Sequence, residues 1–436
     1  MFRFYAKNKN VLYLCIKIEV MKARYLSKEI KRLAESLNGR ILVLTGARQI
    51  GKTTISKQLF ADYEYLSIED PIQSQALSMM TAKQWKSLYP KAILDEVQKM
   101  PVLIRSIKSV YDQWEEPRYI LLGSSQLLLL QKVKESLAGR CVIIDMYPLT
   151  LPELCTTSFN DDVVDSPLQK IIKSGDLPDL FPSFVLDSSH SDKMIAWNHL
   201  LTFGGYPALV SDDRTDREKY EWLAGYVRTY LERDVRDIAV MSDLEPYTKL
   251  QKVLALQTGS LCNVSALSTK VGVSAPTVKK YLQYLSLSYQ TITLPSWERN
   301  ESKRLVKAPK IHFVDYGVVQ AILGKQAQPN GNEFESIVVS EIYKQTKQID
   351  PNARFYHLRT SDGREVDLIV EVESGYFAFE IKLTDHVSKT DARHLRELNE
   401  ILNDKPLLHS FVLSNDVQTS ELGDNITAIH AAYFLG

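Results

Sequence analysis

The segment Gly46–Thr54 carries the residues with the clearest chemical meaning in this chain. Its sequence fits the pattern G-x-x-x-x-G-K-T. Glycines in such a loop let backbone N–H groups approach phosphate oxygens, and the following helix directs the positive end of its dipole at the same anion. We expect Lys52 to reach the β- and γ-phosphates and Thr53 to hold a magnesium ion. The predicted phosphate-binding residues are Gly46, Ala47, Arg48, Gln49, Ile50, Gly51, Lys52, Thr53 and Thr54.

Two adjacent carboxylates, Asp95 and Glu96, follow a short apolar run in the pattern called Walker B. Asp95 would bind the magnesium ion, directly or through water, and Glu96 would polarise the attacking water. Strand ends often carry acids, so the pair is a weak signal alone. Together with the phosphate loop it predicts hydrolysis of a triphosphate, with ATP and Mg²⁺ as cofactors.

Other polar residues are candidates for supporting roles at this site. Ser124 or Ser125 follows a predicted strand and could sense the γ-phosphate or the water, although an exposed turn serine is nearly as plausible. Arg140 could stabilise transition-state charge, or it could be a surface arginine. Arg48 could add positive charge near the phosphates or bind a neighbouring carboxylate.

These residues need a sheet to position them. Short apolar segments alternate with helical patterns and predict five strands, at Arg40–Leu44, Tyr63–Ile68, Lys91–Glu96, Arg118–Leu122 and Cys141–Asp145. This alternation is typical of a parallel α/β sheet that is buried on both faces. Ligands bind such sheets at the carboxyl ends of strands, where Gly46, Asp95 and Ser124 all fall.

The bulk composition restricts the class of protein. A chain of 436 residues is expected to form several domains, and its formal net charge of zero gives no general argument for nucleic acid. Its four scattered cysteines argue against a zinc cluster and a disulfide framework and fit a reducing cytoplasm. No apolar run approaches the roughly 20 residues that a bilayer requires. We interpret the first twenty residues as an extension or a misplaced start.

Residues 248–320 predict a helix-turn-helix followed by a two-stranded wing. Asn263 is expected to cap a helix that ends at Val271, and Gly272 to form the turn into a helix that starts near Ser274. Basic residues on the last helix and in the wing could engage DNA phosphates, although such units also serve as protein contacts. These basic residues are Lys279, Lys280, Arg299, Lys303, Arg304, Lys307 and Lys310.

A β-hairpin near the C-terminus carries a second group of ionisable residues. In either of two turn registers, Asp367, Glu380 and Lys382 share one face of the hairpin, with Asp367 opposite Glu380 or opposite Lys382. Two carboxylates and a lysine can bind a divalent metal and assist attack by water on a phosphodiester, and Glu335 could add a third carboxylate. Cross-strand ion pairs on a half-exposed hairpin are the simpler alternative.

Taken together, these motifs resemble a group of bacterial and archaeal AAA-type ATPases. Members join a P-loop module to a winged helix and a C-terminal domain similar to PD-(D/E)XK nucleases. The matching stretches are 44–54, 93–98, 123–125, 137–140, 148–153, 203–207, 309–317, 365–367 and 380–382. Ala47 stands where a proline is usual, a change that should leave the phosphate cradle intact. The resemblance implies an extension (1–21), an ATPase core (22–155), a helical lid or linker (156–247), a winged helix (248–320) and a nuclease-like domain (321–436).

Three hypotheses follow from these residues. The first is an ATPase whose nucleotide state rearranges the winged-helix and nuclease-like units on DNA. The second adds metal-dependent cleavage of DNA by the C-terminal domain. The third is a nucleotide-switched protein scaffold that binds no nucleic acid. Self-association is a further expectation, and no membrane partner is expected.

Overall fold

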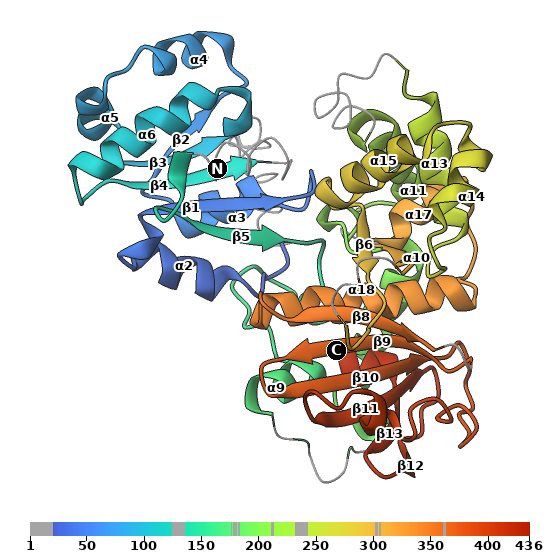
Figure 1. The fold of residues 1–436 in the computed structure, drawn as a ribbon. Coiled ribbons are helices and arrows are strands. Elements are labelled where there is room, and N and C mark those ends of the chain that lie inside the picture. The colour runs from blue at the N-terminus through green and yellow to red at the C-terminus, as the bar shows by residue number, and fades with distance from the viewer. Residues whose placement is uncertain are drawn as a thin grey trace, which may run out of the picture.

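The computed structural model describes residues 21–123, 136–175, 177, 181, 184–210, 213–231, 243–300, 304, 307–360 and 363–436. Figure 1 shows a five-stranded sheet with its helices, a mostly helical region beside it, and a six-stranded sheet near the C-terminus. The long helix α18 (Gly331–Ile349) lies between the helical region and the second sheet. No helix within the described ranges is both long and apolar enough to cross a bilayer.

The first sheet is parallel throughout, as predicted. Its strands are, in spatial order, β2 (Glu64–Ser67), β3 (Lys91–Asp95), β4 (Arg118–Gly123), β1 (Ile41–Gly46) and β5 (Val142–Met146). All six residues of β1 are buried, because this strand is paired on both sides and covered on both faces. The central strand therefore delivers Gly46 to the carboxyl edge of the sheet.

Alternate residues of β1 face two different cores. Leu42 and Leu44 belong to the largest core, which includes residues of the two helices on that face of the sheet and continues into the rest of the molecule. Ile41 and Val43 belong to a smaller core with residues of three helices on the other face. The first pair is α2 (Ser27–Glu35) and α3 (Lys52–Leu59). The second set is α4 (Pro71–Ser78), α5 (Ala82–Leu88) and α6 (Pro101–Gln113). Short 3-10 turns occur at η1 (Asn38–Arg40) and η2 (Val97–Lys99).

The chain after β5 reaches both other regions of the molecule. It forms α8 (Leu151–Leu154), α9 (Pro167–Ser174), η3 (Phe184–Leu186), α10 (His190–Phe203), η4 (Pro207–Leu209), α11 (Asp216–Tyr226) and the π-helix η5 (Val227–Leu231). Helix α9 packs against α18 and against the last helix, α20 (Ala431–Leu435). Part of the segment predicted as a lid or linker thus covers the C-terminal unit.

The predicted helix-turn-helix segments are helices at the expected positions. They are α13 (Glu245–Leu256), α14 (Val264–Val271) and α15 (Ala275–Leu287). The Asn263 side chain caps α14, Gly272 ends it with a φ of 83°, and Ser274 caps α15. An antiparallel pair follows, β6 (Thr291–Leu294) with β7 (Lys310–Phe313), and α17 (Tyr316–Leu323) then packs on α10, α11 and α13.

The second sheet is mixed. Its strands are, in order, β12 (Ser420–Gly423), β13 (Ile426–His430), β11 (Leu407–Ser414), β10 (Gly375–Ile381), β9 (Glu365–Val372) and β8 (Arg354–Arg359), with the short helix α19 (Leu398–Ile401) before β11. In the β9–β10 hairpin Val372 pairs with Gly375, so the turn is Glu373-Ser374. Of the two registers considered, this is the one in which Asp367 lies opposite Glu380.

Candidate functional site

The phosphate-binding loop connects β1 to α3, as predicted. Its backbone needs glycine at both ends, since Gly46 has a φ of 149° and Gly51 a φ of 95°. A Cβ atom on Gly46 would lie 2.3 Å from the carbonyl oxygen of Met146 on the neighbouring strand. Helix α3 then begins at Lys52, so its N-terminus lies against the loop.

Lys52 folds back over this loop. Its Nζ donates to the carbonyl oxygens of Gly46 (2.8 Å) and Ala47 (2.7 Å), and the residue is 8% exposed. These acceptors are neutral, and phosphate oxygens accept stronger, charge-assisted hydrogen bonds from an ammonium group. The lysine is therefore positioned beside the place where a triphosphate would bind.

Thr53 and Asp95 form an oxygen pair next to the lysine. The Thr53 hydroxyl donates to Asp95 Oδ2 at 2.8 Å, and the Tyr65 hydroxyl donates to the same oxygen at 2.9 Å. Burial, reinforced by Asp95, raises the pKa of Tyr65, so Tyr65 remains a donor. A hydroxyl and a carboxylate are hard oxygen ligands, and this pair fits a magnesium ion of the kind that accompanies ATP.

Glu96 lies at the end of β3 in a strained conformation. Its φ of 57° places it in the left-handed region, which is uncommon for a residue other than glycine. Gln98 Nε2 donates to Glu96 Oε2, and Arg48 Nη1 lies 3.8 Å from Oε1. Of the two roles considered for Arg48, the structure shows the contact with a neighbouring carboxylate.

A cavity of about 710 Å³ opens in front of these residues. Among its lining residues are Arg48, Gln49, Ile50, Gly51, Lys52, Thr53, Thr54, Tyr65, Asp95 and Glu96, together with Pro207, Ala208, Asp213 and Arg214 from the helical region. Neither Tyr65 nor Arg24 was predicted from the sequence to belong to this site. Arg24 steadies the loop, because Nη1 donates to Ile50 O (3.0 Å) and Nη2 to Tyr147 O (2.6 Å).

Among the residues predicted for supporting roles at this site, Arg140 is described and lies elsewhere. Ser124 and Ser125 lie outside the described residues. Arg140 does not line the cavity; its Nε donates to Asp112 Oδ1 on α6 at 2.7 Å. The described chain therefore assigns Arg140 to a surface ion pair, which was the alternative considered for it.

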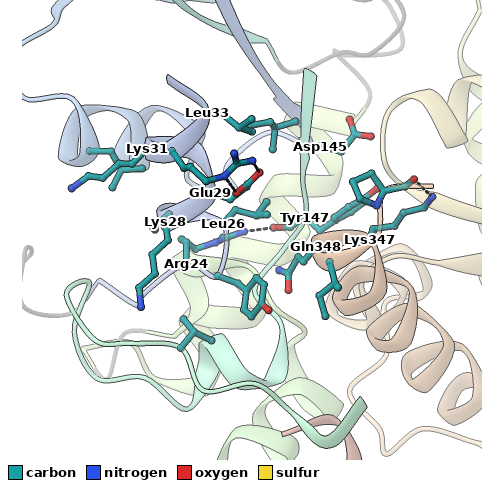
Figure 2. Close-up of a pocket in the computed structure, with 18 of the residues that line it drawn as sticks. Arg24, Leu26, Lys28, Glu29, Lys31, Leu33, Asp145, Tyr147, Lys347 and Gln348 are labelled. Atoms are coloured by element: carbon teal, nitrogen blue, oxygen red, sulfur yellow. Dashed lines mark hydrogen bonds and ion pairs between the residues drawn. The ribbon is translucent and has the colours of Figure 1, made fainter. Parts of the chain in front are cut away.

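A larger cavity, of about 1160 Å³, lies between α2, β5 and α18 (Figure 2). Several of its charged groups bind one another: Lys28 contacts Asp162, Arg32 contacts Glu29, and Lys173 contacts Asp165. None of the phosphate-loop residues lines it. The smaller cavity is therefore the nucleotide-site candidate.

Two tyrosines connect the nucleotide site to the helical region. The Tyr226 hydroxyl at the end of α11 donates to the carbonyl oxygen of Arg48 at 3.3 Å. The Tyr289 hydroxyl, just after α15, lies 2.6 Å from Asp145 Oδ1 and 3.1 Å from Thr45 Oγ1. Thr45 immediately precedes Gly46, so both tyrosines contact the phosphate loop or the strand that delivers it.

The C-terminal sheet brings together the second predicted group. Glu380 Oε1 accepts from Lys382 Nζ at 2.6 Å, and Asp367 Oδ2 accepts from the backbone N–H of Ile381 at 2.9 Å. The structure adds a residue that the sequence placed in the wing. Lys310 on β7 directs its Nζ to Glu335 Oε1 (3.0 Å), Glu365 Oε1 (3.0 Å) and Asp367 Oδ1 (3.4 Å).

This arrangement does not fit a divalent metal. The carboxylate oxygens that would be ligands converge on an ammonium group instead. In the part of the chain that the structure describes, no group of three or more His, Cys, Asp or Glu side chains has a geometry suited to a metal ion. We therefore derive no metal chemistry at Asp367 and Glu380.

The comparisons with known proteins agree with the first site. Residues 38–155 match the AAA domain family. This match supports an AAA-type P-loop module in that part of the chain. Residues 194–329 and 330–434 match two further families, each described as a domain of unknown function.

Relatives cover most of the chain at low identity. An uncharacterized protein of Mycobacterium tuberculosis, Rv2008c, is 26% identical over 407 residues, covering 91% of this chain and 81% of the relative. One from Haemophilus influenzae is 23% identical over 375 residues, covering 79% and 84%. The Walker-type ATPase PABY2304 of Pyrococcus abyssi aligns with a TM-score of 0.44 and 15% identity, over 69% of this chain and 96% of that one. At this TM-score the structural match carries no argument, and the family match alone supports the AAA-type P-loop module.

Proposed function

We propose that the chain is a Mg²⁺-dependent ATPase. The observation that carries the proposal is the convergence of Lys52, Thr53, Asp95 and Glu96 on one cavity at the carboxyl edge of a parallel sheet. The loop between Gly46 and Lys52 fits the β- and γ-phosphates, and the cavity volume suits a nucleotide. When bound, Mg²⁺ would neutralise phosphate charge in contact with Thr53 and Asp95.

The side chains around the cavity have separate roles in hydrolysis. Lys52 exchanges the carbonyl oxygens of its own loop for phosphate oxygens and so stabilises the negative charge that develops in the transition state. Glu96 orients the attacking water and accepts its proton. Gln98 and Arg48 hold the Glu96 carboxylate against the cavity wall until substrate binds.

The experiment measures MgATP binding and phosphate release by the full chain. Glu96→Gln should bind MgATP with near-normal affinity and release phosphate about 100-fold more slowly, in line with the loss of a general base. The control Lys91→Ala removes an exposed lysine on β3 that binds Asp62, and it should keep full turnover. Normal turnover in Glu96→Gln would exclude this site as the centre of hydrolysis.

We further propose that the nucleotide state is coupled to the helical region. Tyr226 binds the backbone of Arg48 inside the loop, and Tyr289 contacts Thr45 directly before it. A shift of the loop on binding or hydrolysis therefore changes contacts at the end of α11 and at the end of α15. Coupling of this kind needs a differential contact in the two states, and these hydroxyl groups supply one.

A second candidate function is nucleic-acid binding by a winged helix-turn-helix built from α13, α14, α15, β6 and β7. Residues 246–297 contain five lysines and neither aspartate nor glutamate. All five lysines are exposed: Lys249, Lys252, Lys270, Lys279 and Lys280. Such a local excess of positive charge in a chain of zero net charge favours phosphate contacts.

We base this proposal on the helices because most of the described cations predicted for the wing have partners within the chain, although Arg299 is exposed. Arg304 stacks on Trp297 and Tyr356, Lys307 binds Glu298, and Lys310 is buried. Lys303 lies outside the described residues. Three of the wing cations are thus engaged within the chain, whereas Lys279 and Lys280 on α15 face solvent.

Salt-dependent binding tests this candidate. Lys279→Ala/Lys280→Ala should weaken binding to a DNA duplex. The slope of log K against log salt concentration should become shallower by about two, because two phosphate contacts are lost. The matched double variant Lys83→Ala/Lys91→Ala removes two exposed lysines from the first sheet region and should bind normally. Absence of salt-dependent binding in the wild-type chain would favour the alternative, an ATP-switched protein scaffold. Self-association stays a prediction.

A further inference from the structure

Lys310 is a deeply buried charged group that lies outside the nucleotide-site candidate. Its side chain is 4% exposed, and three carboxylates from two elements surround its ammonium group. Glu335 comes from the first turns of α18, and Glu365 and Asp367 come from β9. A lysine is almost never fully buried unless it is paired, so the surrounding carboxylates account for its position.

We propose that the ammonium group of Lys310 takes the place of a metal cation in this carboxylate cluster. We call the cluster of Glu335, Glu365, Asp367 and Glu380 around the lysine the socket. It joins β7 to the C-terminal sheet and is not a divalent-metal site. This role of Lys310 is separate from ATP hydrolysis and does not depend on it. It replaces the metal-dependent cleavage that the residue types alone suggested for Asp367 and Glu380.

The geometry around the ammonium group carries the inference. A divalent cation requires carboxylate oxygens at about 2.0–2.6 Å. A cation bound by Glu335 Oε1, Glu365 Oε1 and Asp367 Oδ1 would lie where the Lys310 Nζ lies. Two further oxygens of the cluster have partners of their own: Asp367 Oδ2 accepts from the Ile381 N–H and Glu380 Oε1 accepts from Lys382 Nζ. Glu380 Oε2 is buried and has no hydrogen-bond partner among the described residues.

The charges of the cluster can balance without a metal. Glu335, Glu365, Asp367 and Glu380 face the two lysines Lys310 and Lys382. Burial, followed by the charge of Asp367, raises the pKa of Glu335 to about 8 and that of Glu380 to about 7. Burial alone would lower the pKa of Lys310, but the carboxylates around it raise it instead. Protons held by Glu335 and Glu380 therefore offset the excess negative charge.

The socket is one part of a longer contact between two segments of the chain. Lys310 belongs to the segment 194–329 and the carboxylates to the segment 330–434, which match separate families. Beside the socket, the backbone N–H of Trp297 donates to His357 O at 2.6 Å, and the His357 N–H donates to Pro295 O at 3.0 Å. Backbone pairing and the buried ion cluster together fix β6 and β7 against β8 and β9.

The test is a Mn²⁺ titration of the full chain without nucleotide, followed by electron paramagnetic resonance of free Mn²⁺. All proteins carry Asp95→Asn, so that the nucleotide site contributes no metal. With Lys310 intact we expect no binding that depends on Asp367 up to about 1 mM, the weak end of divalent-cation sites. Lys310→Met should gain one site, and Lys310→Met/Asp367→Asn should lose it again.

The control is Lys307→Met, which removes a neighbouring lysine that binds Glu298 and lies outside the socket. It should gain no site. Mn²⁺ binding to the protein with Lys310 intact, abolished by Asp367→Asn, would overturn the proposal, and this arm does not require Lys310→Met to fold. A folded Lys310→Met protein that gains no site would also contradict it, because the lysine would then not be what excludes the cation.

Discussion

The nucleotide-site candidate and the carboxylate socket contain the same kinds of groups in opposite arrangements. At the first site, Lys52 binds backbone carbonyl oxygens at the edge of an open cavity, and Asp95 binds hydroxyl groups. At the second, Lys310 lies among three carboxylates and is almost completely buried. In the first arrangement the lysine and the acid can exchange their present partners for a ligand. In the second, the lysine and the carboxylates are bound to one another.

This difference explains why similar residue types have different chemistry. A lysine held by neutral acceptors gains energy when phosphate oxygens replace them. If a lysine buried among carboxylates moved to another ligand, it would leave the carboxylate charges uncompensated in a mostly buried site, which carries a large energetic cost. The first site is therefore suited to exchange of partners and the second to permanent structure.

The largest expected effect on the free energy of unfolding is at the socket. Lys310→Met leaves several carboxylates without their cation and should lower the free energy of unfolding by about 3–5 kcal/mol. Guanidinium denaturation measures this. Lys307→Met, at a half-exposed ion pair with Glu298, should cost no more than about 1 kcal/mol. Equal effects of the two substitutions would remove the distinction between the socket and an ordinary surface pair.

A smaller effect is expected where the nucleotide site meets the helical region. Tyr289→Phe removes the hydroxyl that contacts Asp145 and Thr45, at a cost of about 1 kcal/mol. Amide hydrogen exchange of α15 in the presence of MgATP should then be roughly five-fold faster than in the wild-type chain, which is the same free energy expressed as a ratio. Unchanged exchange would mean that this contact does not couple the two regions.

A further effect concerns how the stability contributed by the socket depends on pH. The folded chain holds a proton on Glu335, with a pKa raised to about 8, after the unfolded chain has released it near 4.5. Stability contributed by this group is therefore lost as pH rises from about 4.5 to about 8. Glu335→Gln should flatten that slope in denaturation midpoints, and the remaining slope from Glu380 should end near pH 7. A steeper slope in Glu335→Gln would contradict the proton assignment.

The nucleotide site could be predicted from sequence because most of it is local. Gly46, Gly51, Lys52 and Thr53 lie in one loop, and the predicted parallel order of the strands places Asp95 beside them. Tyr65 could not be predicted, because nothing in its sequence context distinguishes a tyrosine that binds Asp95 from one that packs in a core. Arg24 is similar, since its partners Ile50 and Tyr147 depend on how distant segments fold.

The socket could be predicted only in part from the periodicity of the sequence. Alternation along the strands correctly placed Asp367, Glu380 and Lys382 on one face, and the Glu373-Ser374 turn selected one of the two registers considered. From the sequence, Lys310 is expected to act as a wing cation because it lies in the basic stretch of the predicted wing. The structure instead buries it against a sheet that begins 44 residues later in the chain, at β8 (Arg354–Arg359). Packing between separate units determined its partner, and no local pattern encodes that.

The central claim is that the loop Gly46–Thr54 binds and hydrolyses MgATP. Its most direct test is phosphate release from ATP by the purified full chain and by Lys52→Ala. We predict Mg²⁺-dependent turnover in the wild-type chain and a loss of at least about 100-fold in the variant, because one preorganised charge at the transition state is removed. Unchanged turnover in Lys52→Ala would contradict the account.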